Sequence, residues 1–552
     1  MMNGGDAMKK IPYGESDFKK IILEDYYYVD KTMYLEKLEE VSSKVVYLRP
    51  RRFGKTLFTS MMGYYYDVNS SNLYDDLFKN TYVYNHPTKN KNNYYILKFD
   101  FSGMSNYDGS LEDLIHKFNM ILCVSINNFL DYYDLKYEIK DDLSPAEVLM
   151  CFLSFCKSLK LEKKLYIIID EYDNFTNSIL SSKNMEMFHF ILGKNGFVKD
   201  FYAKIKEYSG TVIDRVFITG VCSISLDSMT SGFNISTNIT NDYRFNSMTA
   251  LTHDEVKELL KEIPDGEKHY NIMIENYDGY LFNRIIKEKV FNPTLTMYYV
   301  KSVIETGMEP LELMDSNIIS SYEQIKNIVS LGDYKEIMDD IFDNGEIVSS
   351  LKVNFNLNGE FNKNEIISLL YYFRYLTIKS AKDNVHYIFT IPNKVIKTVY
   401  SEYYLNIMNE YKIRLEDEEE SDAAYSVREE GDLKKLCDYI SNLLENADNR
   451  LYLNFKEKDL QIILYTLLIK YDGIDIELEY KRGNNFIDVV IFTKKYNYVI
   501  ELKYIKEKEK DTYHEVYQKA KEQIENYHLE KDNVKKYIII FTKSNYTLEE
   551  VK

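Results

Sequence analysis

Residues 49–56, which run Arg-Pro-Arg-Arg-Phe-Gly-Lys-Thr, are the stretch of this chain best suited to binding phosphate. They follow an apolar run over 45–48 that is typical of a strand and precede a segment over 57–66 that is typical of a helix. In such a loop the backbone N–H groups point at phosphates, the lysine reaches the terminal phosphates and the threonine binds Mg²⁺. By itself the short Gly-Lys-Thr motif fits a solvated loop equally well. The candidate nucleotide-binding residues are Arg52, Gly54, Lys55 and Thr56, with Thr56 also a candidate Mg²⁺ ligand.

Two acidic residues, Asp170 and Glu171, end a strongly apolar run over 165–169. A continuous run of this kind predicts a buried parallel strand. An aspartate at the carboxyl end of such a strand is placed to hold Mg²⁺ beside bound phosphates, and the next glutamate to polarise the attacking water. A core strand followed by a polar turn is the plain alternative, but together with the loop the pair favours nucleotide binding. A similar run over 216–220 carries Thr219, where we expect contact with the γ-phosphate.

A second set of residues suited to chemistry lies near the end of the chain. Asp488 falls within one expected strand, and Glu501 and Lys503 end the next. Because side chains alternate along a strand, Glu501 and Lys503 point to one face of the sheet. Two carboxylates and a lysine on one face fit metal-assisted phosphodiester hydrolysis, with Asp488 and Glu501 as Mg²⁺ ligands and Lys503 orienting water or stabilising charge. Chance occurrence in a charged protein is the alternative.

The elements that must position these residues follow from the apolar patterning. Apolar runs over 45–48, 95–101, 165–169 and 215–220 alternate with helical segments, which predicts a parallel sheet covered by helices. Near the C-terminus we expect a helix over 459–470, strands over 474–480, 486–492 and 498–502, a helix over 513–527 and a strand over 537–541.

The chain is long enough for several domains. With 552 residues, of which 45% are hydrophobic, two to four domains are expected. Six acids within 416–422 suggest a solvated linker. The expected divisions are a lead-in over 1–35, an α/β domain over 36–300, a mainly helical region over 301–410, an acidic linker over 411–430 and a last domain over 431–552.

Composition limits the classes of function. A net charge of −18 argues against a general, non-specific nucleic-acid binder, although the lysine-rich segment 494–510 could form a local basic groove. Five scattered cysteines without a C-x-x-C pair, and no H-E-x-x-H motif, argue against a zinc site. The absence of a signal peptide and of any 18-residue apolar run predicts a cytoplasmic protein without membrane contact.

The N-terminal motifs resemble those of the AAA-ATPase-like proteins that carry a C-terminal PD-(D/E)XK nuclease-like domain. The segments that carry the resemblance are Ile-Pro-Tyr-Gly at 11–14, Tyr-Val-Asp-Lys-Thr at 28–32, the loop at 49–56, Ile-Asp-Glu-Tyr-Asp at 169–173, Thr-Gly-Val at 219–221, Ser-Gly-Phe-Asn at 231–234, Tyr-Asp-Gly-Tyr at 277–280 and Asn-Pro at 292–293. Arg49 replaces the first glycine of the G-x-x-x-x-G-K-[ST] pattern, and this form is the family's own. The resemblance implies a P-loop NTPase (AAA-like) domain that binds ATP, followed by an α/β nuclease-like domain.

Two further expectations come with this resemblance. Gln523 and Tyr527 match the Q-x-x-x-Y motif of RecB-type nucleases in the same superfamily, and their spacing would place both on one helix face. We therefore add them to the candidate catalytic residues. The superfamily also tends to use a helical acid, for which Glu457, Asp459 and Glu477 are all candidates.

The sequence thus predicts an ATP-binding, ATP-hydrolysing domain joined through helices to a Mg²⁺-dependent nuclease domain that acts on DNA or RNA. One alternative is an ATP-dependent interaction switch whose nuclease fold binds nucleic acid or protein without cutting it. Another is an ATPase whose C-terminal domain is purely structural. An oligomer is compatible with all three functions, but the sequence does not indicate an oligomeric state.

Overall fold

The computed structural model of the chain describes residues 9–104, 110–140, 142–177, 187, 190–191, 196–224, 233–310, 312–314, 321–332, 337–338, 340–341, 345–355, 360–409, 417–448, 452, 455–482, 485–506, 512–529 and 531–551. Residues 231–232 and 507–510, which belong to two segments noted above, lie outside this set. The chain divides into two compact units. The first comprises Met1–Ile318, Asn327–Ile337 and Ile347–Asn393, and the second Ile319–Lys326, Met338–Glu346 and Lys394–Lys552.

The first unit contains the expected parallel sheet. Its strands are β1 (Lys44–Leu48), β2 (Tyr94–Asp100), β3 (Lys164–Asp170), β4 (Ile213–Gly220) and β5 (Thr237–Asn238), in the order β2-β3-β4-β1-β5. The apolar run of β3 is buried along its whole length after Lys164, as a strand covered on both faces requires. Leu48 of β1 pairs with Gly220 of β4, so the carboxyl ends of these strands meet at one edge. This edge carries the candidate nucleotide residues.

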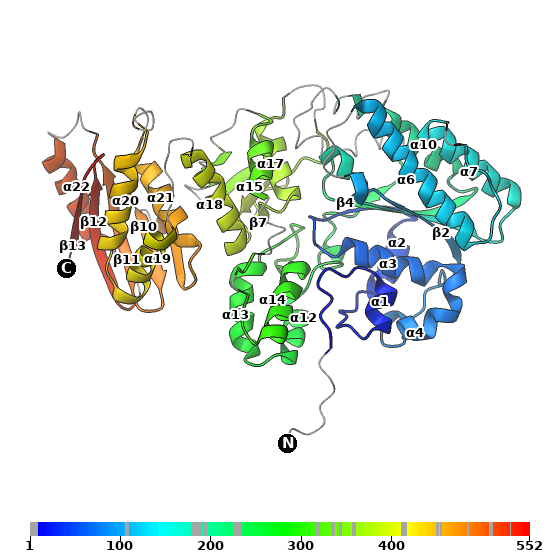
Figure 1. Cartoon of the computed structure of the whole chain (residues 1–552), viewed down its shortest axis with the longest axis horizontal. Coiled ribbons are helices and arrows are strands. Elements are labelled where there is room, and N and C mark those ends of the chain that lie inside the picture. The colour runs from blue at the N-terminus through cyan, green and yellow to red at the C-terminus, as the bar shows by residue number, and fades with distance from the viewer. Residues whose placement is uncertain are drawn as a thin grey trace, which may run out of the picture. The chain divides into compact units, whose positions relative to one another are not determined.

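Helices cover both faces of this sheet (Figure 1). On one face lies α3 (Lys55–Tyr66), with α1 (Phe18–Leu23) and α4 (Tyr74–Phe78) beyond it. On the other lie α6 (Leu111–Tyr132), α7 (Pro145–Leu159) and α10 (Phe197–Tyr208). The α/β class predicted from the alternating apolar runs is confirmed.

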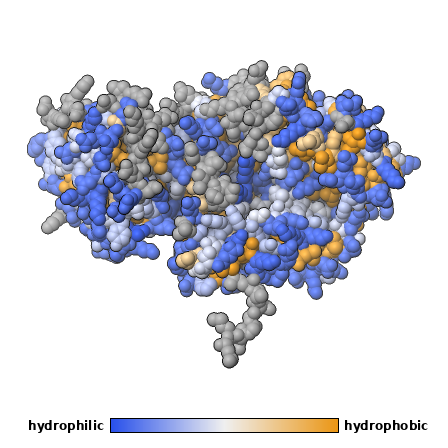
Figure 2. Space-filling model, viewed as in Figure 1, coloured by the Kyte–Doolittle hydropathy of each residue, from blue (hydrophilic) through white to orange (hydrophobic). Residues whose placement is uncertain are grey.

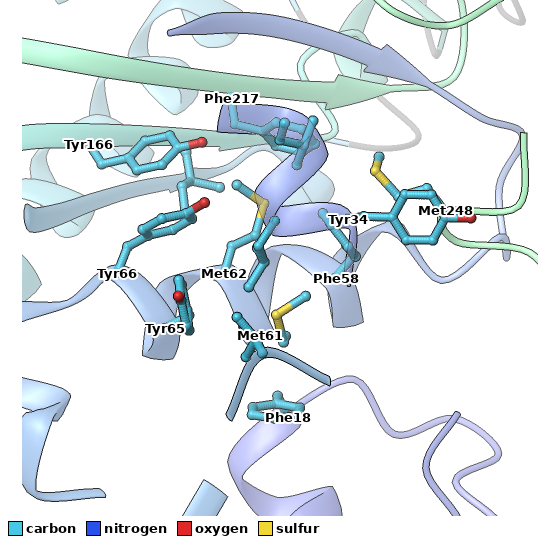
Figure 3. Packing of buried hydrophobic residues seen from close by; sticks show 14 of the residues in the cluster. Phe18, Tyr34, Phe58, Met61, Met62, Tyr65, Tyr66, Tyr166, Phe217 and Met248 are labelled. Carbon is cyan, nitrogen blue, oxygen red and sulfur yellow. The ribbon is translucent and has the colours of Figure 1, made fainter. Parts of the chain in front are cut away.

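Aromatic and methionine side chains fill the space between α3 and the sheet (Figure 3). Phe58, Met62 and Tyr66 of α3 pack in one cluster with Tyr166 and Phe217 of the sheet. The buried Tyr66 hydroxyl also has a polar partner, since it donates to the Glu39 carboxylate at 3.1 Å. This packing anchors the helix that follows the phosphate-binding loop, and so holds the loop against the strand ends.

Helices dominate the chain after the parallel sheet. They are α12 (His253–Leu259), α13 (Gly266–Tyr277), α14 (Pro293–Thr306), α15 (Ser321–Val329), α17 (Lys363–Tyr372) and α18 (Lys394–Asn409). The Asn-Pro motif at 292–293 starts α14, because the Asn292 side chain accepts the Leu295 N–H at 3.1 Å and Pro293 takes the first helical position. A small sheet of β6 (Glu346–Ser350), β8 (His386–Thr390) and β7 (Thr377–Ala381) accompanies them.

The second unit contains the predicted α-β-β-β-α-β series. It consists of α21 (Glu457–Ile469), β9 (Ile474–Arg482), β10 (Asn485–Thr493), β11 (Asn497–Tyr504), α22 (Tyr513–Glu525) and β12 (Val534–Phe541). A further strand, β13 (Tyr546–Val551), completes a mixed sheet in the order β13-β12-β11-β10-β9, in which β11 and β12 run parallel. Apolar side chains of α22, including Ala520 and Ile524, pack on this sheet against Val490 and Ile538.

Two helices precede this series, and one of them differs from expectation. The acidic stretch expected to be a solvated linker forms α19 (Asp417–Tyr425), which a π-helical turn over Ser426–Glu430 connects to α20 (Lys434–Asn446). Glu420 within it is buried and pairs with Lys470 Nζ at 2.8 Å. One acid of the block thus has a cationic partner within the second unit.

The visible surface is mostly hydrophilic, with apolar patches over the layer of α6 and α7 (Figure 2). Met120 and Val124 of α6 are each about half exposed there. Within the described part of the chain, no helix combines the length and apolar character needed to cross a membrane.

Candidate nucleotide site and carboxylate–lysine cluster

The phosphate-binding loop runs directly into the N-terminus of α3. Gly54 is the residue before the helix and has a φ of +70°, and a Cβ there would lie 3.0 Å from the Thr249 carbonyl oxygen. Only glycine suits both conditions. Because glycine has no side chain to cap the helix, the first N–H groups of α3 stay available to an anion. Arg52 also has a positive φ, +66°, so it is a second residue of the loop in the left-handed conformation.

Lys55 is buried at the centre of this loop. Its Nζ donates to the carbonyl oxygens of Arg49 and Pro50, each at 3.0 Å. Burial lowers the pKa of Lys55, while the carboxylates of Glu171, Asp170 and Asp173 act in the opposite direction. A buried ammonium whose hydrogen-bond partners are carbonyl groups favours the approach of an anion.

Arg49 takes part in this arrangement only through its carbonyl oxygen, because its side chain makes contacts elsewhere. Its guanidinium is buried, donates to the carbonyl oxygens of Leu48, Thr240 and Phe245 at 2.7 to 2.9 Å, and lies over the rings of Tyr47 and Phe282. Burial lowers the pKa of Arg49. The residue that replaces the usual glycine is therefore a structural anchor for the loop.

A cavity of about 310 Å³ opens at this loop. Arg52, Gly54, Lys55, Thr56 and Glu171 are among the residues that line it, so the structure brings five of the predicted residues together. The rest of the lining comes mainly from the lead-in and from later segments, and most of its side chains are apolar or aromatic. These residues include Pro12, Tyr13, Tyr27, Tyr28, Val29, Met248, Leu251 and Met297. The sequence offered only the resemblance at 11–14 and 28–32 as a signal for the lead-in part of this wall.

Glu171 lies in the cavity wall with a φ of +52°, which is an unusual conformation for a glutamate. Backbone strain of this kind often accompanies a functional position. The preceding residue, Asp170, is completely buried at the end of β3. Its carboxylate accepts the Glu171 N–H at 3.1 Å and the Thr59 hydroxyl at 3.2 Å, and burial raises its pKa.

Two predicted residues stand back from the cavity. Among the described residues that line it, neither Asp170 nor Thr219 is present. The Thr219 hydroxyl is buried at the end of β4 and has no hydrogen-bond partner within the described part of the chain. A buried hydroxyl without a partner is costly, so this group keeps unused hydrogen-bonding capacity.

The C-terminal candidates converge on one ammonium. Lys503 Nζ of β11 lies 3.0 Å from Asp488 Oδ2 of β10, 2.7 Å from Glu501 Oε1 of β11 and 3.1 Å from Glu457 Oε1 of α21. The Leu502 N–H also donates to Asp488 Oδ2 at 2.8 Å. The Tyr527 hydroxyl donates to Glu501 Oε2 at 2.7 Å. The structure thus brings Asp488, Glu501, Lys503 and Tyr527 together.

Burial and charge both act on these groups. Burial opposes protonation of Lys503, but the surrounding carboxylates of Asp488, Glu501 and Glu457 outweigh it and raise its pKa. Burial raises the pKa of Glu457 to about 7, despite the nearby Lys503 ammonium. Burial also raises the pKa of Glu501, and the negative charge of Asp488 adds to that shift.

The geometry distinguishes the three candidate acids. Glu457, at the start of α21, is the one in contact with Lys503. Asp459 instead accepts the Lys456 N–H at 2.7 Å and caps the same helix. Glu477 is on β9, where Asp475 and Lys397 are its charged neighbours.

Gln523 makes none of the contacts described for this cluster. It is exposed, and no side-chain hydrogen bond of Gln523 occurs among the described residues. Helix α22 ends at Glu525, so Tyr527 lies beyond the helix and the four-residue spacing does not place the two side chains on one helical face.

Two polar residues beside the cluster were missed by sequence reasoning. Gln461, one helical turn after Glu457 on α21, donates to Glu479 Oε1 of β9 at 2.9 Å. Glu479 has a φ of +47° and interrupts the β9–β10 register opposite Asp488. The spacing of four from Glu457 to Gln461 was the available signal, because it places both on one face of α21.

The donors of both sites suit Mg²⁺ in kind, since carboxylate and hydroxyl oxygens are the ligands this ion prefers. Within the described residues, however, no group of three or more His, Cys, Asp or Glu side chains is arranged to hold a metal ion. In the C-terminal cluster the Lys503 ammonium takes the place between the carboxylates.

Comparisons with known proteins agree with these motifs. Residues 12–230 match the family model described as a predicted AAA-ATPase, and residues 455–550 match that of the PD-(D/E)XK nuclease superfamily. The chain therefore carries an AAA-ATPase-like domain and a C-terminal domain of the PD-(D/E)XK superfamily, as predicted.

Individual relatives are more distant. The chain is 24% identical over 309 residues to an Azotobacter chroococcum mcd 1 protein named for its place in the vnfD 5' region. That match covers 52% of this chain and 51% of the relative, so the chain spans about half the relative's length. A Walker-type ATPase of Pyrococcus abyssi aligns with a TM-score of 0.36 and 12% identity, over 72% of this chain and 99% of the other.

Proposed function

We propose that the cavity at the phosphate-binding loop binds ATP with Mg²⁺ and hydrolyses the nucleotide. The observation that carries this proposal is the shared lining of one cavity by Lys55, Thr56 and Glu171, which come from two distant segments of the chain. The helix N-terminus, the buried ammonium and the strained glutamate are together what phosphate binding and water activation require.

Each residue then has a defined role. Lys55, Arg52 and the N–H groups after Gly54 bind the phosphates, and the apolar wall built by the lead-in receives the base. Thr56 and Asp170 would hold Mg²⁺, which neutralises phosphate charge when bound. Glu171 accepts a proton from the attacking water, and the Thr219 hydroxyl senses the γ-phosphate.

For the C-terminal domain we propose metal-dependent cleavage of a nucleic-acid phosphodiester. Asp488 and Glu501, joined by Glu457, would hold Mg²⁺, which lowers the pKa of a bound water. Lys503 stabilises charge on the phosphate, and the Tyr527 hydroxyl orients the Glu501 carboxylate. Gln523, being exposed, is left with at most a contact to substrate.

A second candidate function is an ATP-dependent switch whose C-terminal domain binds nucleic acid or protein without cutting it. The contact of Lys503 with three carboxylates favours this candidate, because the ammonium already balances part of the charge that would attract a metal ion.

One assay separates these functions. Cleavage of labelled DNA and RNA, single- and double-stranded, is measured with and without Mg²⁺ and ATP for wild type, Lys55→Ala and Glu501→Ala. Metal-dependent cleavage that Glu501→Ala abolishes supports the nuclease. If no substrate is cut while ATP is still hydrolysed, the switch is favoured.

A further inference from the structure

Lys31 lines the nucleotide cavity, yet its ammonium is fully engaged with the protein. Its Nζ donates to both oxygens of the Glu255 carboxylate, at 2.6 and 2.7 Å, and to the Ser247 carbonyl oxygen at 3.1 Å. An ammonium has three N–H bonds, so these acceptors use its donor capacity. Burial lowers the pKa of Lys31, and the Glu255 carboxylate acts against that effect. Lys31 is thus a buried structural cation at the edge of the cavity.

This ion pair joins two walls of the cavity that are distant in sequence. Lys31 belongs to the lead-in wall, which we define as residues 12–16 and 27–31, and Glu255 follows a second wall of the cavity, residues 248–251. Glu255 is also part of the first turn of α12, where its carboxylate accepts the Thr252 N–H at 2.8 Å. The contact therefore ties the lead-in wall to the start of a helix.

The lead-in wall is anchored from its other side as well. Asp30 Oδ2 accepts the Tyr82 N–H at 2.6 Å, and Thr32 Oγ1 accepts the Val83 N–H at 3.1 Å. These bonds hold the neighbours of Lys31 against α5 (Tyr82–Asn85), while Lys31 itself reaches Ser247 and Glu255, which flank the second wall. The polar residues of the Tyr-Val-Asp-Lys-Thr segment thus act as a two-sided clamp.

We propose that Lys31 and Glu255 form a latch that sets the spacing of the two walls and thereby the affinity for ATP. The inference rests on the proposed function of this cavity. A ligand that touches both walls binds more tightly when they are already held at the right spacing, since it does not have to order them. Lys31 and Glu255 are then positioning residues, because neither touches the reacting phosphate.

The test compares wild type with Lys31→Met, Glu255→Gln, the double variant and the control Lys268→Met. Glu255→Gln keeps a side chain that can cap α12, so we expect this variant to fold. It therefore tests the latch even if Lys31→Met fails to fold. The control breaks another 2.7 Å ion pair, between Lys268 and Glu309, which does not line the cavity among the described residues. Calorimetry gives the Kd for Mg·ATP, steady-state kinetics give kcat and KM, and thermal melting is measured with and without ATP.

Both single variants are expected to raise Kd and KM by about 10-fold, equivalent to about 1.4 kcal/mol, with kcat within roughly 2-fold of wild type. The double variant should be no weaker than the worse single variant, since both changes break one contact. Lys268→Met should bind like wild type.

The outcomes separate the latch from the function on which it rests. If the single variants melt at lower temperature but bind Mg·ATP with the wild-type Kd, the pair is purely structural and the latch is wrong. Loss of kcat at unchanged KM would also overturn it. If wild type binds no nucleotide, the proposed function falls and the latch with it.

Discussion

The Asp173 carboxylate accepts the backbone N–H of Cys222 at 2.6 Å and so joins the turn after β3 to the segment after β4. The Val221 N–H donates to the same carboxylate at 3.1 Å, and a Cβ on Gly220 would lie 2.4 Å from Asp173 Oδ1. Asp173 is therefore a scaffold for the two strand ends; it is completely buried and is not among the described residues that line the cavity. This leaves Glu171 as the acid exposed to the nucleotide cavity after β3.

Lys55→Ala should abolish measurable binding of Mg·ATP, because it removes the buried cation at the centre of the loop. Calorimetry is the direct measurement. Lys44→Ala is a matched control, since Lys44 starts β1, the strand that leads into the loop, at the end away from the loop, and its Nζ donates to the Asp214 carbonyl oxygen. Equal binding by wild type and Lys55→Ala would show that this is not a nucleotide site.

Glu171→Gln should retain ATP binding while hydrolysis falls by about 10²-fold or more, because the amide keeps the size of the side chain but cannot accept the proton. Phosphate release under saturating ATP is the measurement. Asp173→Asn is the comparison, and it should lower the melting temperature by weakening the backbone contacts at Val221 and Cys222. Unchanged hydrolysis in Glu171→Gln would assign the base to another group.

Asp488→Asn and Glu501→Gln should each remove nuclease activity while the domain stays folded, because Lys503 keeps two carboxylate partners in either variant. Activity is measured on the substrates given above, and folding by thermal melting. Retained cleavage in both variants would place the metal site elsewhere.

Lys503→Ala should instead destabilise the domain, because it leaves three neighbouring carboxylates without their cation. The expected loss is about 3 kcal/mol in the free energy of unfolding without divalent ions, and Mg²⁺ should restore part of it. Denaturant unfolding with and without Mg²⁺ measures both effects. Lys535→Ala is a control on the same sheet, since its Nζ donates to the Gly431 carbonyl oxygen. A Lys503→Ala protein as stable as wild type would mean that the carboxylates are well solvated.

The raised pKa of Glu457 predicts a pH dependence. Its pKa is about 7 in the folded protein against an ordinary value of 4.5, so between these values the folded state holds a proton that the unfolded state has released. Stability contributed by this group is therefore present below about 4.5 and is lost as pH rises towards 7. Glu457→Gln should flatten this part of the stability profile, measured by denaturant unfolding across the range. Identical profiles for the two proteins would contradict the shift.

The affinity of the cluster for Mg²⁺ should rise with pH, whereas the stability contributed by Glu457 falls. A divalent ion requires the ionised carboxylate, so the affinity of the cluster for Mg²⁺ should rise as pH passes 7 in wild type. The Glu457→Gln variant should bind Mg²⁺ more weakly and with less dependence on pH in this range. Titration of Mg²⁺ followed by melting temperature measures both.

Much of the fold could be predicted because apolar runs are a local property. The runs that became β1, β3 and β4 are buried on both faces, and their length and ends are visible in the sequence. The chemistry-bearing residues at their carboxyl ends were therefore also predictable. Strand β13 was missed because its side chains are only partly buried, which leaves a weak apolar pattern.

The parts that sequence reasoning missed depend on distant contacts or on where a helix stops. Glu457 and Asp459 are two positions apart, and only the helix start decides which faces Lys503 and which caps the helix. The spacing of Gln523 and Tyr527 implied a shared helix face, but α22 ends at Glu525, before Tyr527. The wall formed by the lead-in depends on contacts such as Lys31 with Glu255, which no local pattern shows.

Arg49 has a consequence for engineering this loop. A glycine at position 49 would complete the familiar P-loop pattern, yet it would remove the guanidinium that serves the carbonyl groups of Leu48, Thr240 and Phe245. Those buried acceptors would then lose this donor, the Phe245 carbonyl keeping the Met248 N–H at 3.3 Å, and the rings of Tyr47 and Phe282 would border an empty volume. Changing Arg49 to the consensus glycine would therefore destabilise the protein. A motif search that requires the first glycine would also miss chains that have an arginine at this position.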